Sequence, residues 1–406
     1  MAKLSVTMFP AKNGDCFLIS IGESSKKHIL IDSGYTQTYN LHLKKVLCSL
    51  AENGEQLSLF VITHVDQDHL LGAITFLSDN NTNRFIDITE IWYNSYRHLQ
   101  FSKEKTKQIG RFERKALEEE VALGSSFISG AEENLSDSDI SVKQGSTLAS
   151  LIYEGGYNWN KSFNGKAVSI NINTFVQIEG IKIWLLSPDE EKLQNLSNEW
   201  LSQLHSHKFN FKLSDEEIFD DAFEFYMLRK VEMAPDDVDI SLCDGAGLDI
   251  DQFINKEQNA VDASTQNGSS IALFIEQDDK KLLFLGDAHP DIILSSLRGI
   301  KAQGVNTDHF DLVKLPHHGS AKNITPELAA LLNADRYLIS TNGDIHQHPD
   351  FEAMARIILA QPNEPKKFIF NYSTEIAQLL MNEKWMKKYR YTLHIGDGTR
   401  PLVIEL

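Results

Sequence analysis

Apolar residues follow two periodicities along the chain, and together these predict alternating strands and helices. In the first ninety or so residues strand patterns dominate, with helical spacing between them. The predicted strands lie at 3–9, 17–21, 28–31, 57–62 and 88–93, and the predicted helices at 41–51 and 70–77. The run at 57–62 is almost continuously apolar, as expected of a strand that is covered on both faces.

The same alternation returns in the last third of the chain. The predicted strands lie at 270–276, 281–285, 310–315, 336–340 and 367–372, with helices at 292–301, 325–332, 352–359 and 374–388, and two closing strands around 396–398. Helices that alternate with strands in this way are typical of a layered α/β fold.

Between these regions the sequence changes character. Residues 97–140 are dense in charge, and residues 187–260 are polar with helix-favouring composition. Strand patterns appear in this block at 170–176 and 181–186. We therefore predict an α/β core formed by residues 1–95 and 266–406, interrupted at 96–265 by a large, mainly helical insertion that lies over one face of the core, with a lid, a specificity region and a partner surface as its alternative roles.

Composition and charge limit the partners of this chain. The formal net charge is −18, which disfavours bulk adhesion to nucleic acid or to an anionic membrane, although bound cations could still attract a small phosphate-bearing substrate. The three cysteines show no CxxC spacing, which is typical of free thiols in a reducing compartment. No stretch has the length and apolarity of a membrane span or a signal peptide, so we expect a cytoplasmic protein.

The strongest chemical signal is the motif HVDQDH. Its four metal-capable side chains, His64, Asp66, Asp68 and His69, lie within six positions. They follow the apolar run at 57–62 directly and precede a helical pattern. A ligand cluster at a strand-to-helix junction is what a rigid, solvent-open metal site requires, and a polar loop without a metal is the alternative.

Two carboxylates end other predicted strands. Asp32 follows three apolar residues and precedes a glycine turn, where it could orient a ligand histidine. Asp287 ends the run FLGD and could place one oxygen on each of two metals. The alternative for Asp287 is a cap for the helix that begins near Pro290.

Histidines follow two later strands. Adjacent side chains project in different directions, so at most one of His317 and His318 is expected to bind a given metal, and the other could donate a proton or hold a phosphate. Of His346 and His348 we favour His348 as a ligand, because the proline that follows restricts it to extended geometry.

The complete donor set indicates two metal ions. Its seven members are His64, Asp66, Asp68, His69, Asp287, His317 and His348. Seven ligands are too many for one tetrahedral zinc ion and suit two ions that share a carboxylate. Without cysteine the set fits two Zn²⁺, with Mn²⁺ or Fe²⁺ as alternatives because three ligands are hard oxygens.

In this order, the segments ILIDSG, THVDQDH and FLGDA and the late histidines resemble the metallo-β-lactamase superfamily. Within it, the chain resembles the hydrolase domain attached to the ComEC-type DNA-uptake channel and the soluble relatives of that domain. The residues that carry this closer resemblance are NGDC at 13–16, Asp66 where most of the superfamily has histidine, NGSS at 267–270, LPHHGS at 315–320 and the late Asn-Gly and His-Pro.

The resemblance implies a four-layer αβ/βα sandwich with a dinuclear site at one edge. One metal would take His64, Asp66 and His317, the second Asp68, His69 and His348, and Asp287 would bridge them. The usual third histidine of the superfamily is missing ahead of the LGDA strand, where this chain has Asn267 and Ser270.

We expect metal-assisted phosphodiester hydrolysis by a bridging hydroxide. Asp68 and His318 are the expected catalytic residues, His318 as proton donor, and Lys314, Asn267 and Asn342 the expected phosphate contacts. A carbon-ester, lactone or β-lactam hydrolase and a non-enzymatic component of a multiprotein system are the alternatives.

The expected substrate contains phosphate, with nucleic acid or an oligonucleotide among the candidates. Residues 103–115 hold six Lys or Arg against two Glu and form either a nucleic-acid arm or a solvated helical face. No membrane partner is expected, and protein partners are left open.

Overall fold

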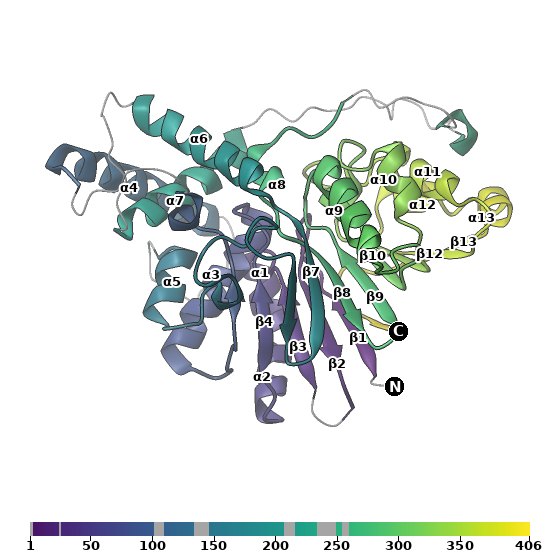
Figure 1. Cartoon of the computed structure of the whole chain (residues 1–406), viewed down its shortest axis with the longest axis horizontal. Helices are drawn as coiled ribbons and strands as arrows, with labels where there is room; N and C mark the ends of the chain where they lie inside the picture. The colour runs from purple at the N-terminus through teal and green to yellow at the C-terminus, as the bar shows by residue number, and fades with distance from the viewer. Residues whose placement is uncertain are drawn as a thin grey trace.

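The computed structural model of the chain describes residues 3–23, 26–100, 109–133, 146–206, 216–233, 249–253 and 260–406, and contains two mixed β-sheets with helices around them (Figure 1). The six-stranded sheet has the order β14 (Leu402–Glu405), β1 (Leu4–Met8), β2 (Phe17–Ile21), β3 (Lys27–Ile31), β4 (Leu57–Val61) and β5 (Ile91–Trp92). The eight-stranded sheet has the order β13 (Tyr391–Ile395), β12 (Lys366–Phe370), β11 (Arg336–Ile339), β10 (Leu312–Lys314), β9 (Lys280–Phe284), β8 (Ala272–Gln277), β7 (Ile181–Ser187) and β6 (Phe175–Ile178).

The two sheets pack face to face because each strand sends alternate apolar side chains to either side. Ile19 and Ile29 of the first sheet share one buried cluster with Ile183, Ile275 and Leu282 of the second. The opposite faces are covered by helices, which gives the order helix, sheet, sheet, helix. This mixed α/β architecture is consistent with the sandwich that the motifs imply.

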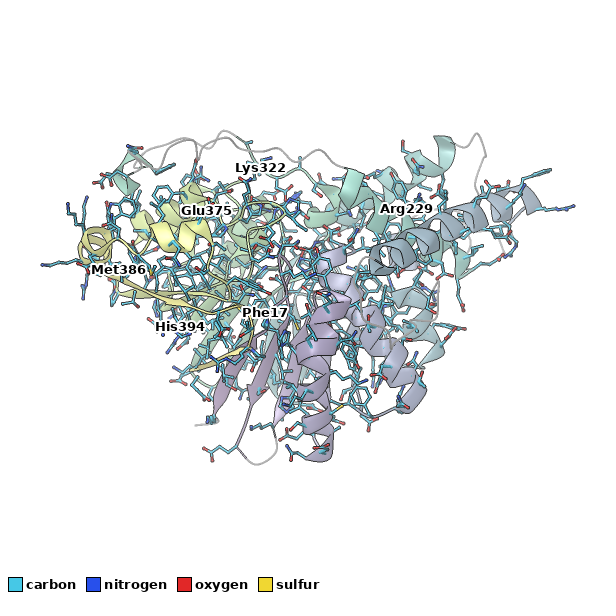
Figure 2. The ribbon with its side chains drawn as sticks, turned by 180° about the vertical axis from the view of Figure 1, so that it is seen from behind. Phe17, Arg229, Lys322, Glu375, Met386 and His394 are labelled. Atoms are coloured by element: carbon cyan, nitrogen blue, oxygen red, sulfur yellow. The ribbon has the colours of Figure 1, made fainter. Side chains whose placement is uncertain are left out.

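Helices cover the outer face of each sheet. On the first sheet they are α1 (Thr36–Thr38), the π-helical turn Tyr39–Leu43, α2 (Lys44–Glu52), α3 (Gln67–Asn83) and α5 (Leu148–Glu154). On the second they are α9 (Pro290–Ala302), α10 (Pro326–Leu331), α11 (Phe351–Ala360), α12 (Glu375–Leu379) and α13 (Glu383–Tyr389). Seen from behind, Arg229 and Met386 lie in opposite halves of the molecule (Figure 2).

Parallel pairing fixes the edge at which functional residues can meet. Strands β3, β4 and β5 are parallel, and so are β9 to β13. The carboxyl ends of parallel neighbours lie at one edge of their sheet, and in layered α/β folds functional side chains collect there. The segments after β3, β4, β9, β10 and β11 carry the residues singled out by the motifs.

The middle block is not helical throughout. Its remaining helices are α4 (Arg111–Glu133), α6 (Glu190–Ser206), α7 (Ile218–Met233) and α8 (Thr265–Gly268), with 3-10 turns at Tyr96–Leu99, Lys161–Phe163 and Ile250–Phe253. Strands β6 and β7 lie inside the same block, and β7 pairs antiparallel with β8. The second sheet therefore begins well before residue 266, because the apolar alternation of these strands buries them against the first sheet.

Several predicted boundaries shift for identifiable reasons. The helix expected at 374–388 is divided into α12 and α13, since the Asn382 side chain accepts hydrogen bonds from Lys384 N (3.0 Å) and Trp385 N (3.3 Å) and so begins a new helix. The two closing strands join different sheets, β13 beside β12 and β14 beside β1. Within the described ranges, no helix combines the length and apolarity that a membrane crossing needs.

Candidate metal centre

Asp32 organises the loop that carries the HVDQDH motif. It follows β3 with a left-handed backbone, and its carboxylate accepts hydrogen bonds from Thr63 N (2.8 Å) and Thr63 Oγ1 (2.8 Å). The same carboxylate accepts from His69 Nδ1 at 2.8 Å, as expected for a carboxylate that orients a ligand histidine. With Nδ1 occupied, His69 presents the lone pair of Nε2 to the centre.

Four imidazoles converge on one carboxylate oxygen. The distances to Asp287 Oδ2 are 3.6 Å from the Nε2 atoms of His69 and His318 and 3.9 Å from those of His64 and His317. The carboxylate of Asp287 follows β9 and is 3% exposed. This residue is therefore the hub of the site, as a shared carboxylate would be.

The other ring nitrogen of each histidine is bound away from the hub. His318 Nδ1 donates to the Ser340 carbonyl (2.8 Å), and His317 Nδ1 lies 2.9 Å from Asn323 Oδ1. His64 Nδ1 lies 3.0 Å from Thr63 Oγ1, whose own proton goes to Asp32. Because these acceptors hold the Nδ1 protons, each ring turns Nε2 inward, and this is the atom that would bind a metal once it is deprotonated.

Two further carboxylates from the motif line the centre. Asp66 Oδ2 lies 3.3 Å from His64 Nε2, while Asp66 Oδ1 accepts from Gln266 Nε2 at 2.6 Å. Asp68 Oδ2 lies 3.5 Å from His318 Nε2 and 3.8 Å from His69 Nε2. Among the described residues, three groups of ligand atoms are close enough to hold a metal ion. They are His64, His69 and Asp287; Asp68, His69 and His318; and Asp15, Asp32 and His69, the last of which lies on the Nδ1 side of His69.

The centre contains buried polar atoms that fit bound cations. Among the described residues, His64 Nε2, His69 Nε2, His318 Nε2 and Asp287 Oδ1 are buried without a hydrogen-bond partner. Such atoms are rare in folded proteins because each costs free energy when it is left unsatisfied. Imidazole lone pairs directed at a carboxylate suit a divalent cation between them.

Nearby carboxylates control the ionisation of the histidines in the centre. Burial would lower the pKa of His318, but the charges of Asp287 and Asp15 raise that pKa to about 9. Burial would also lower the pKa of His69, but the charges of Asp68 and Asp32 raise that pKa well above its usual range. Cations that bind here must therefore displace protons from imidazoles.

The buried ammonium group of Lys314 balances the negative charges of Asp15 and Asp287. Its Nζ forms an ion pair with Asp15, donates to the Gly286 carbonyl (3.1 Å) and lies 3.6 Å from Asp287 Oδ1. Both Lys314 and Asp15 are 1% exposed. Lys314 was predicted to contact a substrate phosphate, and in the structure its ammonium group is buried and already paired with Asp15.

The histidines after β10 occupy two environments. His317 and His318 both adopt left-handed backbone conformations, which directs the adjacent rings differently. The His318 side chain is 2% exposed and lies among Asp68, His69 and Asp287, whereas the His317 side chain is 21% exposed. The geometry therefore groups His318 with the candidate ligands and leaves His317 at the open side.

The remaining predicted residues lie around this cluster. His348 Nδ1 contacts Asp350 Oδ1 (3.3 Å). The ring centre of His348 lies 5.1 Å from that of His317 and 6.0 Å from that of His346. Asn267 Nδ2 donates to Asp262 Oδ2 at 2.7 Å, close to His317. Asn342 donates its side chain to Asp344 (2.5 Å), so its described contact is a local turn.

Sequence reasoning missed several residues that position the site. Asn13 donates to Asp68 Oδ2 (3.1 Å), Asp262 accepts from Asn267 and Asn323, and Ser340 holds His318 through its carbonyl. Of the residues that position the site, only Asn13 and Asp15 belong to a recognisable motif, NGDC at 13–16. The other roles depend on contacts between distant segments and have no local pattern.

The comparisons with known proteins agree with this geometry. Residues 10–140 match the family model described as the metallo-beta-lactamase superfamily. This match contains the HVDQDH motif and indicates, together with the clustered His and Asp side chains, a metal-dependent hydrolase. A search of curated proteins found no match.

Proposed function

We propose that this protein is a dinuclear metal-dependent hydrolase that cleaves phosphodiester bonds in a phosphate-containing substrate, with a nucleotide or an oligonucleotide as the favoured class. The observation that carries the proposal is the convergence of four imidazole Nε2 atoms within 3.6–3.9 Å of one carboxylate oxygen of Asp287. The order of the motifs supports the relationship to the soluble relatives of the ComEC-type hydrolase domain.

The contacts favour one division of the ligands. His64 and Asp66 would hold one ion, Asp68, His69 and His318 would hold the other, and Asp287 would be shared. This assignment gives His318 the place first expected for His348 and removes His317 from the ligands. Nitrogen and carboxylate donors without thiolate suit two Zn²⁺, with Mn²⁺ or Fe²⁺ as alternatives.

Two divalent ions, when bound, would supply Lewis acidity and an activated water near neutral pH. The protein supplies the rest. Asp32 and Ser340 fix the orientation of the ligand imidazoles, and Lys314 with Asp15 steadies the charge of Asp287. His317, the more exposed histidine, would give a proton to the leaving oxygen when its ring is protonated, the role that the sequence suggested for His318.

Attack at phosphorus is favoured over attack at carbon by two features of the sequence. Asp66 stands where most of the superfamily has histidine, and the HHGS segment supplies His318 to the centre. By analogy with the family that the motifs resemble, both features favour attack at phosphorus.

The test combines metal content with a substrate panel. Purified protein is expected to contain about two divalent ions per chain and to hydrolyse bis(4-nitrophenyl) phosphate but neither a lactone nor a chromogenic β-lactam. Asp68→Ala should lose metal and activity together, and the exposed Asp87→Ala should lose neither. Full phosphodiesterase activity in Asp68→Ala, or preferred hydrolysis of the lactone, would overturn the proposal.

A further inference from the structure

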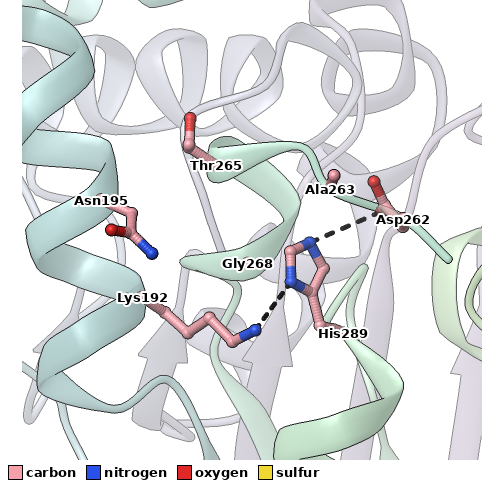
Figure 3. A pocket seen from close by; sticks show the side chains of 7 residues that line it. All are labelled: Lys192, Asn195, Asp262, Ala263, Thr265, Gly268 and His289. Atoms are coloured by element: carbon pink, nitrogen blue, oxygen red, sulfur yellow. Dashed lines mark hydrogen bonds and ion pairs between the residues drawn. The ribbon is translucent and has the colours of Figure 1, made fainter.

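A cavity of about 270 Å³ adjoins the candidate metal centre (Figure 3). It lies between α6, α8 and the beginning of α9. Its lining residues are Lys192, Asn195, Asp262, Ala263, Thr265, Gly268 and His289. The volume is near the lower end of the roughly 300–1,000 Å³ range of ligand pockets, which suits one small ring system.

The cavity and the metal centre share a wall. Asp262 Oδ2 lies 3.7 Å from His317 Nδ1 and 3.9 Å from His289 Nε2, so a single carboxylate touches both. His289 also follows Asp287 by two positions in the chain. A substrate held at the open side of the centre, where His317 is exposed, could therefore place an attached group in the cavity.

The charges in the cavity wall already have partners. Lys192 Nζ donates to Asp291 Oδ2 (2.9 Å) and to His289 Nδ1 (3.1 Å). The Lys192 ammonium group donates to Nδ1, so the ring proton of His289 is on Nε2. Asp262 accepts hydrogen bonds from Asn267 Nδ2 (2.7 Å) and Asn323 Nδ2 (3.0 Å).

This arrangement disfavours a charged occupant. A second phosphate would have to approach the carboxylate of Asp262, and a cation would have to approach the ammonium group of Lys192. An uncharged group with hydrogen-bonding edges meets neither penalty. The exposed amide of Asn195 makes no hydrogen bond to any described residue and faces the cavity from α6, so it is available to such a group.

We propose that this cavity is a subsite for the nucleobase of the substrate, with the Asn195 amide hydrogen-bonding to the edge of the base. An amide side chain offers a donor and an acceptor side by side, the pattern that recognises base edges. The inference rests on the proposed function, because it names the group attached to the scissile phosphodiester.

The test compares substrates with and without a base. Thymidine and adenosine 5′-(4-nitrophenyl) phosphates are expected to show kcat/KM values about tenfold above that of bis(4-nitrophenyl) phosphate. Asn195→Leu should reduce this ratio to about one. Asn198→Leu is the matched control, since Asn198 is exposed on the same helix outside the cavity lining, and should keep the ratio.

A binding measurement separates failure of the subsite from failure of the proposed function. Adenosine monophosphate should bind about tenfold more tightly than ribose 5-phosphate in calorimetry, and equally in Asn195→Leu. Equal binding of the two probes to the wild-type protein, or equal effects of the two Asn→Leu variants, would overturn the subsite even if bis(4-nitrophenyl) phosphate is hydrolysed. Loss of all phosphodiesterase activity with base-dependent binding retained would overturn the reaction and leave the subsite standing.

Discussion

At the scale of single residues, the ion pair between Lys314 and Asp15 shows how the site tolerates its carboxylates. Both groups are buried, and Lys314 also faces Asp287. Burial opposes the charge of Lys314, yet the pKa of this lysine is raised by Asp15 and Asp287. A buried pair of this kind contributes little net stability, but the loss of one partner leaves an uncompensated charge.

We therefore expect Lys314→Met to lower the free energy of unfolding by about 3–5 kcal/mol, measured by urea denaturation of metal-free protein. The double variant Asp15→Asn/Lys314→Met should recover part of this loss, because no lone charge remains. Lys301→Met, which breaks an exposed pair with Asp308, should cost less than about 1 kcal/mol. Equal losses at the two lysines would contradict this interpretation of Lys314.

Glu224 lies away from the candidate metal centre, and its raised pKa predicts that the stability of the protein depends on pH. Burial, with the charges of Asp221 and Asp220, raises the pKa of Glu224 from 4.5 to about 8. Between these values the folded protein keeps a proton that the unfolded chain has lost, so stability should fall as pH rises. The slope from this group reaches at most about 1.4 kcal/mol per pH unit.

Chemical denaturation at several pH values checks this expectation. Glu224→Gln should flatten the fall in stability between pH 5 and 8, because the amide does not titrate. The exposed Glu118→Gln should leave the slope as it is in the wild-type protein. An unchanged slope in Glu224→Gln would show that Glu224 is ionised in the folded state.

The residues that could be predicted are those whose neighbours in sequence are also neighbours in space. His64, Asp66, Asp68 and His69 lie on one short loop and helix start, so their spacing alone placed them together. The choice between His317 and His318 could not be made in this way. It depends on the Ser340 carbonyl, which holds His318 from another strand end.

At the scale of elements, the loop at Gly14 and the start of α3 are in close contact. A Cβ atom added to Gly14 would lie 1.9 Å from the Asp68 carbonyl oxygen, and Asp15 N donates to that carbonyl at 3.3 Å. Only glycine permits this approach. The contact places Asp15 and Asp68 in one site although they belong to different elements.

Gly14→Ala should therefore separate the loop from α3 and lower both stability, by about 1–3 kcal/mol, and metal affinity. Gly299→Ala is the matched control. A Cβ atom there meets nothing within 4 Å in the middle of α9, so alanine should stabilise the protein by about 0.5–1 kcal/mol. Thermal unfolding and metal titration measure both effects, and unchanged metal affinity in Gly14→Ala would contradict the expected coupling.

Helices and strands with strong periodicity were predicted well, since local pattern and burial agree for them. Helix α9 and strands β8 and β9 match their predicted runs within two residues. What the pattern could not show is which sheet a strand joins. Strands β6 and β7 were expected within an insertion but complete the second sheet, because pairing partners are chosen by tertiary packing.

At the scale of the whole molecule, the candidate metal centre joins the two sheets. Its proposed ligands follow β4 of the first sheet and β9 and β10 of the second. Ions bound there should stabilise the folded protein as a unit. An ion at 100 times its dissociation constant contributes about 2.7 kcal/mol.

A thermal scan tests this coupling. Zn²⁺ should raise the Tm of the wild-type protein, and a chelator should lower it. Asp287→Ala should bind no ion at this hub and show the same Tm with and without Zn²⁺. A Zn²⁺-dependent rise of equal size in Asp287→Ala would place the stabilising ion elsewhere in the protein.

The pairing of β14 with β1 has a consequence for biosynthesis. Strand β1 gains its outer neighbour only after more than 390 further residues have been made. Until then the nascent sheet presents an open edge that can pair with other chains. This sheet is therefore complete only after β14 has been made, and chaperone demand should be highest for nascent chains that still lack β14.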